Sequence, residues 1–233
     1  MMGESFLTIG SRNHPEIRPF PKRRSPEHSL RVRSDYSLFF TQSLRSLSVT
    51  ASLFPSSRFL ASALLRPIDF GAVRVIVELG IGTGAITNEI LRRLRPNAVL
   101  IGVDLNPAFV SHVQRKVQDA RFIPVLGRAE RLGTLLGQYG ITRADAIVSS
   151  LGLTGMRPAQ RSAIVAQVAA HLTPDGVLTQ YQYLHVSGKP NWISSLGFAH
   201  FPEREFLSKH FRHVASERVM LNLPPARVYT CRF

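Results

Sequence analysis

Three glycines at alternate positions, Gly80, Gly82 and Gly84, follow a short run of apolar residues. An acidic residue, Glu78, lies two positions before the first glycine, and residues 85–95 have the apolar spacing of a helix. A glycine turn between a buried strand and a helix lets backbone N–H groups approach a ligand closely at the carboxyl edge of a parallel sheet. The spacing is not the Gly-x-Gly-x-x-Gly of dinucleotide sites, so we expect a different ligand.

A second acidic residue, Asp104, ends the next apolar run, at residues 98–103. An acid at this position can accept hydrogen bonds from two ribose hydroxyls, because a carboxylate has two oxygens. Asp104 can alternatively cap the following helix, for which Pro107 is a favourable first residue. The two roles are compatible, and the two strand ends together predict an adenosine site.

Apolar runs and helix-spaced segments alternate along most of the chain. Such alternation is typical of an α/β fold, in which a parallel sheet carries helices on both faces. We predict seven strands, near residues 73–78, 98–103, 121–126, 144–149, 177–183, 211–221 and 226–232. We predict helices near residues 58–66, 85–95, 107–118, 128–138 and 158–172. Pro55 precedes the first of these helices, and Ser56 or Ser57 is expected to cap it.

Arginine dominates the charge of this chain. The sequence has 29 basic and 15 acidic residues, a net charge of +14, and only four of the basic residues are lysines. The planar arginine side chain binds two phosphate oxygens at once, so the charge indicates a polyanionic partner. Nucleic acid and an anionic membrane surface both fit. A general preference for arginine in the source genome is the other explanation.

Three further features narrow the class of protein. No apolar run reaches the roughly 18 residues that a membrane-spanning helix needs, and the first residues lack the pattern of an export signal. The lone cysteine, Cys231, fits a reducing compartment and the packing of a last strand. The eight histidines are scattered, which predicts no metal site. We therefore expect a cytoplasmic protein without a metal.

The amino-terminal part differs from the rest of the chain. Residues 1–34 carry several prolines and scattered charge, which predicts a disordered basic tail. The next segment places apolar residues on one face of a helix, with serine, threonine and arginine opposite. This helix either packs on the rest of the domain or lies in the headgroup region of a bilayer. The residues expected to contact lipid are Tyr36, Phe40, Leu44, Arg45 and Leu47.

The motifs resemble known families at two levels. Glu78 and the three glycines resemble motif I of the class I methyltransferases that use S-adenosylmethionine (SAM). From about residue 36 onward, the chain also resembles the soluble bacterial phospholipid N-methyltransferases, which are similar to phosphatidylethanolamine N-methyltransferase. The matching stretches are residues 53–61, 65–69, 77–84, 91–96, 181–183 and 222–226.

The resemblance implies a Rossmann-like fold with a seven-stranded sheet and an N-terminal amphipathic helical extension. The expected division is a tail at 1–34, helices at 35–66 that dock on a membrane and cover the cofactor, and a methyltransferase domain at 67–233. It also implies methyl transfer from SAM to the amine headgroup of a phospholipid, with S-adenosylhomocysteine (SAH) as product. The expected partner is an anionic membrane surface at the inner face of the cell membrane, and not nucleic acid.

We expect the cofactor to contact residues at several strand ends. Glu78 and the three glycines are expected around the methionine part of SAM, and Asp104 on its ribose. The resemblance adds further neighbours of the cofactor: Ser56, Ser57, Leu105, Ala129, Glu130 and Ser150.

The acceptor amine must lose a proton before it can attack a methyl group. Tyr181 and Tyr183 share one face of a predicted strand, which makes them the candidates for deprotonating or orienting the amine. After the fourth strand, residues 149–153 depart from the Ser-Gly/Ala-Leu-Pro of the phospholipid enzymes. Another aminolipid, such as an ornithine lipid, is therefore an alternative acceptor. An rRNA adenine is a further alternative, although this segment lacks the proline and aromatic residue that hold a flipped base.

Overall fold

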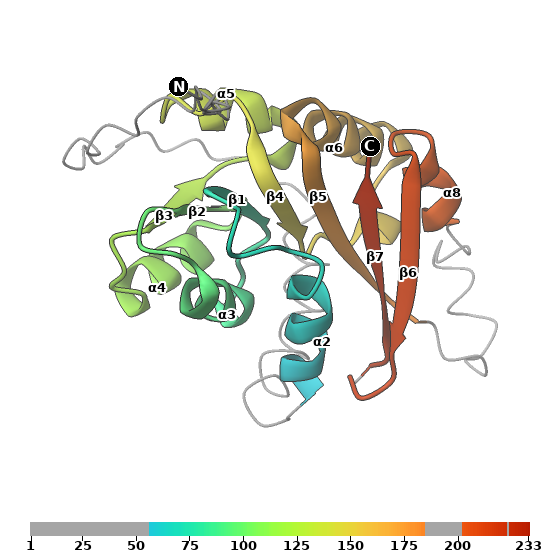
Figure 1. The fold of residues 1–233 in the computed structure, drawn as a ribbon, viewed down its shortest axis with the longest axis horizontal. Coiled ribbons are helices and arrows are strands. Elements are labelled where there is room, and N and C mark those ends of the chain that lie inside the picture. The colour runs from blue at the N-terminus through green and yellow to red at the C-terminus, as the bar shows by residue number, and fades with distance from the viewer. Residues whose placement is uncertain (1–55, 185–201, 223) are drawn as a thin grey trace, which may run out of the picture. The chain divides into compact units, whose positions relative to one another are not determined.

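A computed structural model describes residues 56–184, 202–222 and 224–233. Within them lies a seven-stranded sheet in the order β3-β2-β1-β4-β5-β7-β6 (Figure 1). The predicted seven-stranded sheet with helices on both faces is therefore confirmed. The strands are β1 Val75–Leu79, β2 Val99–Asp104, β3 Phe122–Leu126, β4 Ala144–Ser149, β5 Leu172–Tyr183, β6 His213–Val219 and β7 Ala226–Arg232.

Five of the strands are parallel and two are not. β1 pairs in parallel with β2 and β4, and the parallel part extends to β3 on one side and β5 on the other. β7 is antiparallel to both β5 and β6. The chain reverses its direction of travel across the sheet between β1 and β4, the position at which α/β sheets bind ligands beyond the carboxyl ends of their strands.

Helices cover both faces of the sheet (Figure 1). Apolar residues of α2, α3 and α4 form one buried cluster with the sheet, and those of α5, α6 and α8 belong to a second cluster on the other face. Each cluster consists mainly of Val, Ile and Leu, whose branched side chains fill the space between helix and sheet. The helices are α2 Ser56–Leu65, α3 Ala85–Arg93, α4 Pro107–Lys116, α5 Leu132–Gly137, α6 Pro158–His171 and α8 Glu203–Ser208.

The structure departs from the sequence prediction in three elements. β5 begins at Leu172 rather than near residue 177, with a register shift against β4 between Ala144 and Ala146. The helix expected at 128–138 is divided into a short 3₁₀ turn, Ala129–Arg131, and α5. The helix α8 was not expected, since six residues are too few to show a clear period.

Several predictions lie outside the described residues. These are the tail at 1–34 and the lipid-contacting face of the N-terminal helix with Tyr36, Phe40, Leu44, Arg45 and Leu47. They stay predictions.

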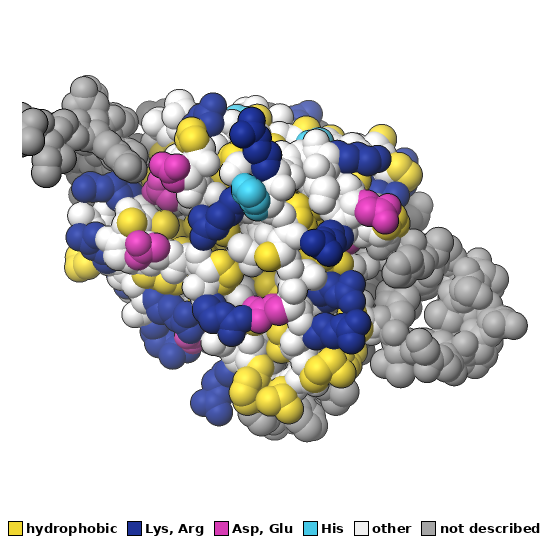
Figure 2. Space-filling model, turned by 45° about the vertical axis from the view of Figure 1, so that its right-hand side comes forward, with side chains coloured by type: hydrophobic (Ala, Val, Ile, Leu, Met, Phe, Trp, Pro, Cys, Tyr) yellow, Lys and Arg dark blue, Asp and Glu magenta, His cyan; other side chains and the backbone are white. Residues whose placement is uncertain are grey.

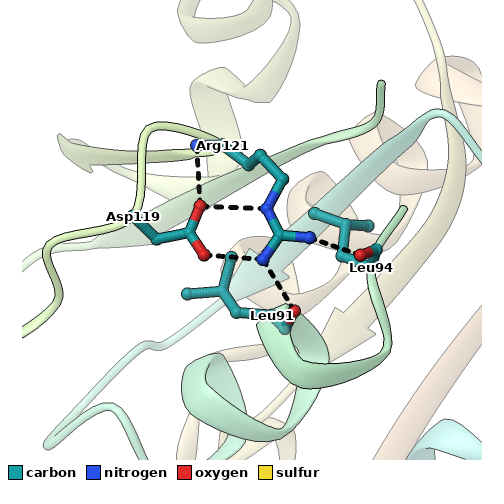
Figure 3. Close-up of polar contacts among 4 residues, drawn as sticks. All are labelled: Leu91, Leu94, Asp119 and Arg121. Carbon is teal, nitrogen blue, oxygen red and sulfur yellow. Dashed lines mark hydrogen bonds and ion pairs between the residues drawn. The ribbon is translucent and has the colours of Figure 1, made fainter. Parts of the chain in front are cut away.

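A polar anchor fastens the carboxyl end of α3 to the start of β3 (Figure 3). Arg121 donates to the backbone oxygens of Leu91, at 2.9 Å, and Leu94. Asp119 holds the guanidinium from the other side, with 3.0 Å between Nε and Oδ1 and 2.6 Å between Nη2 and Oδ2. The last carbonyls of a helix have no partner within it, so a half-buried cation at this end stabilises the helix. Because α3 is fixed here, its other end is held beside the glycine turn.

The anchor predicts a loss of stability when Arg121 is replaced. Arg121→Gln should lower the free energy of unfolding by about 1–3 kcal/mol, because two helix carbonyls lose a charged donor. Urea unfolding measures the change. Arg115→Gln, at an exposed position on α4, is the control and should stay within about 0.5 kcal/mol of the wild type. Equal stability of the two variants would contradict this role of Arg121.

Candidate active site

The glycine turn after β1 has a backbone that only glycine adopts readily. Gly80, Gly82 and Gly84 have φ values of 84°, 50° and 84°, in the left-handed region. A Cβ at Gly80 would lie 3.3 Å from the side chain of Leu151, whereas no atom lies within 4 Å of the position of a Cβ at Gly82. Open space therefore adjoins the middle of the turn. Gly84 precedes α3 without a side-chain cap, and the first turn of α3 has no acidic residue. Such a helix end can receive an anionic group.

Glu78 is a buried residue that stabilises this turn. Its side chain is 1% exposed, and its Oε2 accepts a hydrogen bond of 2.7 Å from the hydroxyl of Thr87 in α3. Burial raises its pKa to about 8, the nearby charge of Asp104 adds to the rise, and the bond from Thr87 opposes it. The other oxygen of Glu78 is buried and has no hydrogen-bond partner among the described residues. Glu78 therefore joins β1 to α3 across the turn, and leaves one polar atom for a further partner.

Asp104 lies against the same turn from β2. One carboxylate oxygen accepts from the backbone N–H of Gly82 at 3.0 Å, and the other accepts from that of Asn106 at 2.8 Å. Burial raises the pKa of Asp104, and these hydrogen bonds oppose the rise. The alternative prediction that Asp104 caps the next helix is wrong, because Asn106 is the cap and accepts from the backbone N–H of Ala108 at 2.9 Å. The carboxylate of Asp104 therefore lies directly against the glycine turn, where it could also accept from a ribose hydroxyl.

Ser150 is a predicted cofactor neighbour that the fold brings to the glycine turn. Its backbone N–H donates to the oxygen of Leu79 at 2.8 Å, and a Cβ at Gly80 would lie 3.6 Å from that of Ser150. The Ser150 hydroxyl is buried, and no residue in the described part of the chain forms a hydrogen bond with it. It therefore joins Glu78 as a second unsatisfied polar group around the turn. These orphaned groups, together with the open space at Gly82, fit a polar ligand such as SAM.

The other predicted neighbours differ in their surroundings. Leu105 is 50% exposed beside Asp104, which leaves an apolar surface free for a flat ring. Ala129 is buried, and Glu130 accepts from Arg128 at 2.8 Å and from Gln160 of α6 at 2.9 Å. Glu130 thus holds the segment after β3 against α6, and it has less capacity for a ligand. Ser56 and Ser57 lie within the first turn of α2, not before the helix as a cap would.

The two tyrosines of the predicted acceptor site lie together at the end of β5. Their rings are 5.1 Å apart in an edge-to-face arrangement, and their hydroxyl oxygens are 3.5 Å apart. Burial raises the pKa of Tyr181 well above its ordinary value, and it also raises that of Tyr183. Both phenols are therefore neutral at physiological pH. Such a pair can accept a hydrogen bond from an amine, but it is poorly suited to remove a proton from one.

Two glutamines on β5 make contacts beside the candidate site that the sequence did not lead us to expect. Gln180, which is 2% exposed, donates to the backbone oxygen of Leu151 at 2.8 Å, and Gln182 donates to the hydroxyl of Thr154 at 2.8 Å. They hold the segment after β4, which lies beside the glycine turn. The only available signal in the sequence was the alternation of glutamine and tyrosine over residues 180–183.

Cys231 is fully buried in β7, and burial raises its pKa to about 12, so it is a packing residue and not a nucleophile.

Comparison with known proteins agrees with this geometry. A family model described as a methyltransferase domain matches residues 76–176. The chain is 31% identical over 199 residues to an ornithine lipid N-methyltransferase of Singulisphaera acidiphila, and the match covers 85% of this chain and 96% of that protein. The chain belongs to the class I SAM-dependent methyltransferases. This methyltransferase therefore uses SAM as its methyl donor, and the predictions of enzyme class and cofactor are confirmed.

Two further similarities support more limited conclusions, one because it is short and the other because its sequence identity is low. A ribosomal RNA small subunit methyltransferase H of Nitrosomonas europaea is 30% identical to this methyltransferase over 90 residues, which cover 39% of this chain and 28% of that protein. The crystal structure of the 1,6-didemethyltoxoflavin-N1-methyltransferase of Burkholderia thailandensis, with bound S-adenosylhomocysteine, superposes with a TM-score of 0.59 at 18% identity. It covers 89% of this chain and 92% of that one. At this identity the likeness shows the fold alone.

Removal of the charge at Asp104 should weaken SAM binding. Asp104→Asn should raise the SAM dissociation constant by at least about tenfold, because a charged acceptor is lost from the ribose position. Isothermal titration calorimetry measures the change. Asp145→Asn is a matched control, since the carboxylate of Asp145 also accepts two backbone N–H groups, at 2.8 and 2.9 Å, but at the opposite edge of the sheet. Unchanged affinity in Asp104→Asn would remove Asp104 from the cofactor site.

The burial of Glu78 predicts a pH dependence of stability. In the unfolded chain Glu78 loses its proton near its ordinary pKa of 4.5, whereas the folded protein holds it up to about pH 8. The folded state binds more protons between these values, so the free energy of unfolding falls as pH rises through this window. Glu203, whose pKa burial also raises to about 8, acts in the same direction. Glu78→Gln should make the decline shallower in urea unfolding from about pH 5 to about pH 8.

The control for this experiment is Glu205→Gln, because Glu205 is exposed on α8. It should keep the slope of the wild-type protein. A wild-type slope in Glu78→Gln as well would show that the Glu78 carboxyl is charged in the folded state at neutral pH.

Proposed function

We propose that this methyltransferase transfers a methyl group from SAM to the amine of an aminolipid headgroup, with an ornithine lipid as the favoured acceptor. The observation that carries the proposal is the similarity to the ornithine lipid N-methyltransferase, which extends over 85% of this chain and 96% of that protein. The match therefore extends beyond residues 76–176, which the methyltransferase family model covers. Phosphatidylethanolamine is the second candidate, and its support is the resemblance of residues 181–183 and 222–226 to phospholipid enzymes.

The chain's residues have two tasks in such a reaction. SAM, when bound, supplies an electrophilic methyl group on a sulfonium sulfur. The glycine turn and Asp104 hold the donor in a fixed position, and alignment of this kind lowers a barrier by roughly 7–11 kcal/mol. The neutral phenols of Tyr181 and Tyr183 can orient the acceptor through hydrogen bonds. The amine has an ordinary pKa of about 10.4, so it must release its proton, to water or to a base, before it attacks.

The remaining alternatives have less support. An rRNA acceptor would use the basic charge of the chain, and the relative that acts on ribosomal RNA matches 90 residues. Residues 149–153 contain neither the proline nor the aromatic residue that would hold a flipped base.

In the part of the chain that the structure describes, no helix is long and apolar enough to span a bilayer. A lipid acceptor therefore requires that these residues work at the surface of a membrane.

The proposal is tested by SAH formation from SAM with the purified full-length chain. Vesicles of one anionic composition are supplemented with ornithine lipid, with phosphatidylethanolamine, or with a lipid that lacks an amine, and RNA is a separate arm. We expect SAH and methylated lipid with ornithine lipid, and much less or none with the lipid that lacks an amine. Activity with phosphatidylethanolamine alone would select the second candidate. Activity with RNA alone, or with neither lipid, would overturn the proposal.

A further inference from the structure

At the end of the β6–β7 hairpin, two large apolar residues are exposed and a polar residue is buried. Met220 and Leu221 are 63% and 66% exposed, whereas the next residue, Asn222, is 6% exposed. The Asn222 side chain donates to the backbone oxygen of Pro224 at 2.7 Å, and the backbone N–H of Leu184 donates to that of Pro225 at 2.7 Å. The turn is thus held by its polar residue, while two adjacent large apolar side chains point outward. An adjacent exposed pair of this kind indicates an apolar partner rather than water.

Two arginines lie directly behind this apolar end. Arg218 of β6 and Arg227 of β7 are opposite one another in the antiparallel register. Like charges in this position destabilise a hairpin. Among the described residues neither forms an ion pair with an acid, and the neighbouring Glu217 pairs with Arg66 of α2. Arg218 is exposed, whereas Arg227 is half-buried and donates a hydrogen bond to the hydroxyl of Tyr229. An anion bound beside these arginines would remove their repulsion.

The spacing between the apolar and basic residues suits a lipid surface. Met220 lies two positions after Arg218, a distance of about 7 Å along a strand. Apolar side chains at a bilayer interface lie about 5–10 Å deep, below the level of the charged headgroups. With Met220 and Leu221 at that depth, the arginines would lie at the level of the lipid phosphates.

The hairpin end also lies at the catalytic edge of the sheet. Ala226, the first residue of β7, is paired with Tyr183, the last residue of β5, so the hairpin turns beyond the carboxyl end of β5. The glycine turn follows the carboxyl end of β1 at the same edge. The helix α2 packs against this hairpin and exposes Phe59 by 47%. Figure 2 shows hydrophobic side chains gathered at the lower end of the view, with Lys and Arg side chains beside them. In Figure 1 the hairpin turn and the amino end of α2 lie at this same lower end.

We propose that the β6–β7 hairpin end is a membrane-docking element, in which Met220 and Leu221 enter a bilayer and Arg218 and Arg227 bind anionic lipid headgroups. The occupant of this surface is a bilayer that contains anionic lipid. Docking here turns the catalytic edge toward the membrane, so a lipid amine reaches the methyl donor without leaving the bilayer. The inference rests on the proposed lipid acceptor, which makes a membrane the place of the reaction, but the docking itself is measured without turnover.

The first test places a fluorescent reporter on the hairpin. The native Cys231 is fully buried, so Leu221→Cys in the full-length chain offers one accessible thiol for a polarity-sensitive dye. The dye should shift to the blue on vesicles that contain phosphatidylglycerol. Thr142→Cys is the control, because Thr142 is exposed just before the amino end of β4, at the opposite edge of the sheet, and its dye should report water throughout. A dye at position 221 that stays in water on protein-bearing vesicles would overturn the proposal.

The second test measures vesicle affinity by co-sedimentation. Met220→Ser with Leu221→Ser should weaken binding by about tenfold, because two apolar side chains no longer enter the bilayer. Arg218→Gln should weaken binding to anionic vesicles by about fivefold, and binding to neutral vesicles much less. Arg212→Gln is the matched control, since Arg212 is exposed immediately before the other end of β6. SAM affinity, measured in parallel, verifies the fold of each variant. Wild-type vesicle affinity in the Met220 and Leu221 variant would overturn the proposal.

A third comparison separates this inference from the proposed function. Turnover of the wild type and of the Met220→Ser, Leu221→Ser variant is measured with long-chain aminolipid in vesicles and with a monomeric short-chain aminolipid in solution. Loss of activity on vesicles alone supports docking, and loss on both substrates overturns it. If neither protein methylates lipid, the proposed function fails, while the dye shift and co-sedimentation still decide whether the hairpin binds a bilayer. Light scattering tests whether a second copy of the chain covers this surface instead. If the wild type is a dimer and the Met220→Ser, Leu221→Ser variant is a monomer, the proposal is overturned.

Discussion

The hydrogen bond between Glu78 and Thr87 is the contact on which the site depends. It joins the end of β1 to the first turn of α3 across three glycines in left-handed conformations. A turn of such residues is entropically costly to order, because glycine has many alternatives when unfolded. The buried bond, and Asp104 on the Gly82 N–H from the other side, select one conformation. The backbone of the turn is thereby arranged before any cofactor binds.

The same contact explains why a buried acid is tolerated. Burial raises the pKa of Glu78 to about 8, so at neutral pH the isolated protein keeps most of this carboxyl neutral and avoids a buried charge. The positive charge of a bound SAM would favour the ionised form of the same group. The anchor at Arg121, at the far end of α3, has the complementary effect of fixing the helix from its carboxyl side. The helix α3 is therefore fixed at both ends, and the glycine-rich turn before it is held in one conformation.

The sequence could predict the parts that depend on local pattern. The seven strands, most of the helices and the positions of Gly80, Gly82, Gly84 and Asp104 at strand ends follow from periodicity and glycine chemistry. The contacts of Gln180 and Gln182 could not be predicted, because they reach a segment some 30 residues earlier in the chain and depend on which strands are neighbours. The raised pKa values of the tyrosines were also beyond prediction, since they depend on burial. For this reason the tyrosines looked like candidate bases in the sequence and are better suited to orientation in the fold.

The distribution of charge in the fold connects the composition to the proposed membrane surface. Many acidic side chains are engaged within the structure: Glu89 pairs with arginines on α3, Asp119 with Arg121, and Asp145 accepts from backbone N–H groups. Acids used in this way cannot neutralise basic residues elsewhere, so the excess of positive charge falls on the surface. At the hairpin end this excess stands directly behind exposed apolar side chains. Nucleic acid would match the charge, but Met220 and Leu221 would reach its apolar base faces only by unstacking them, whereas an anionic bilayer matches both.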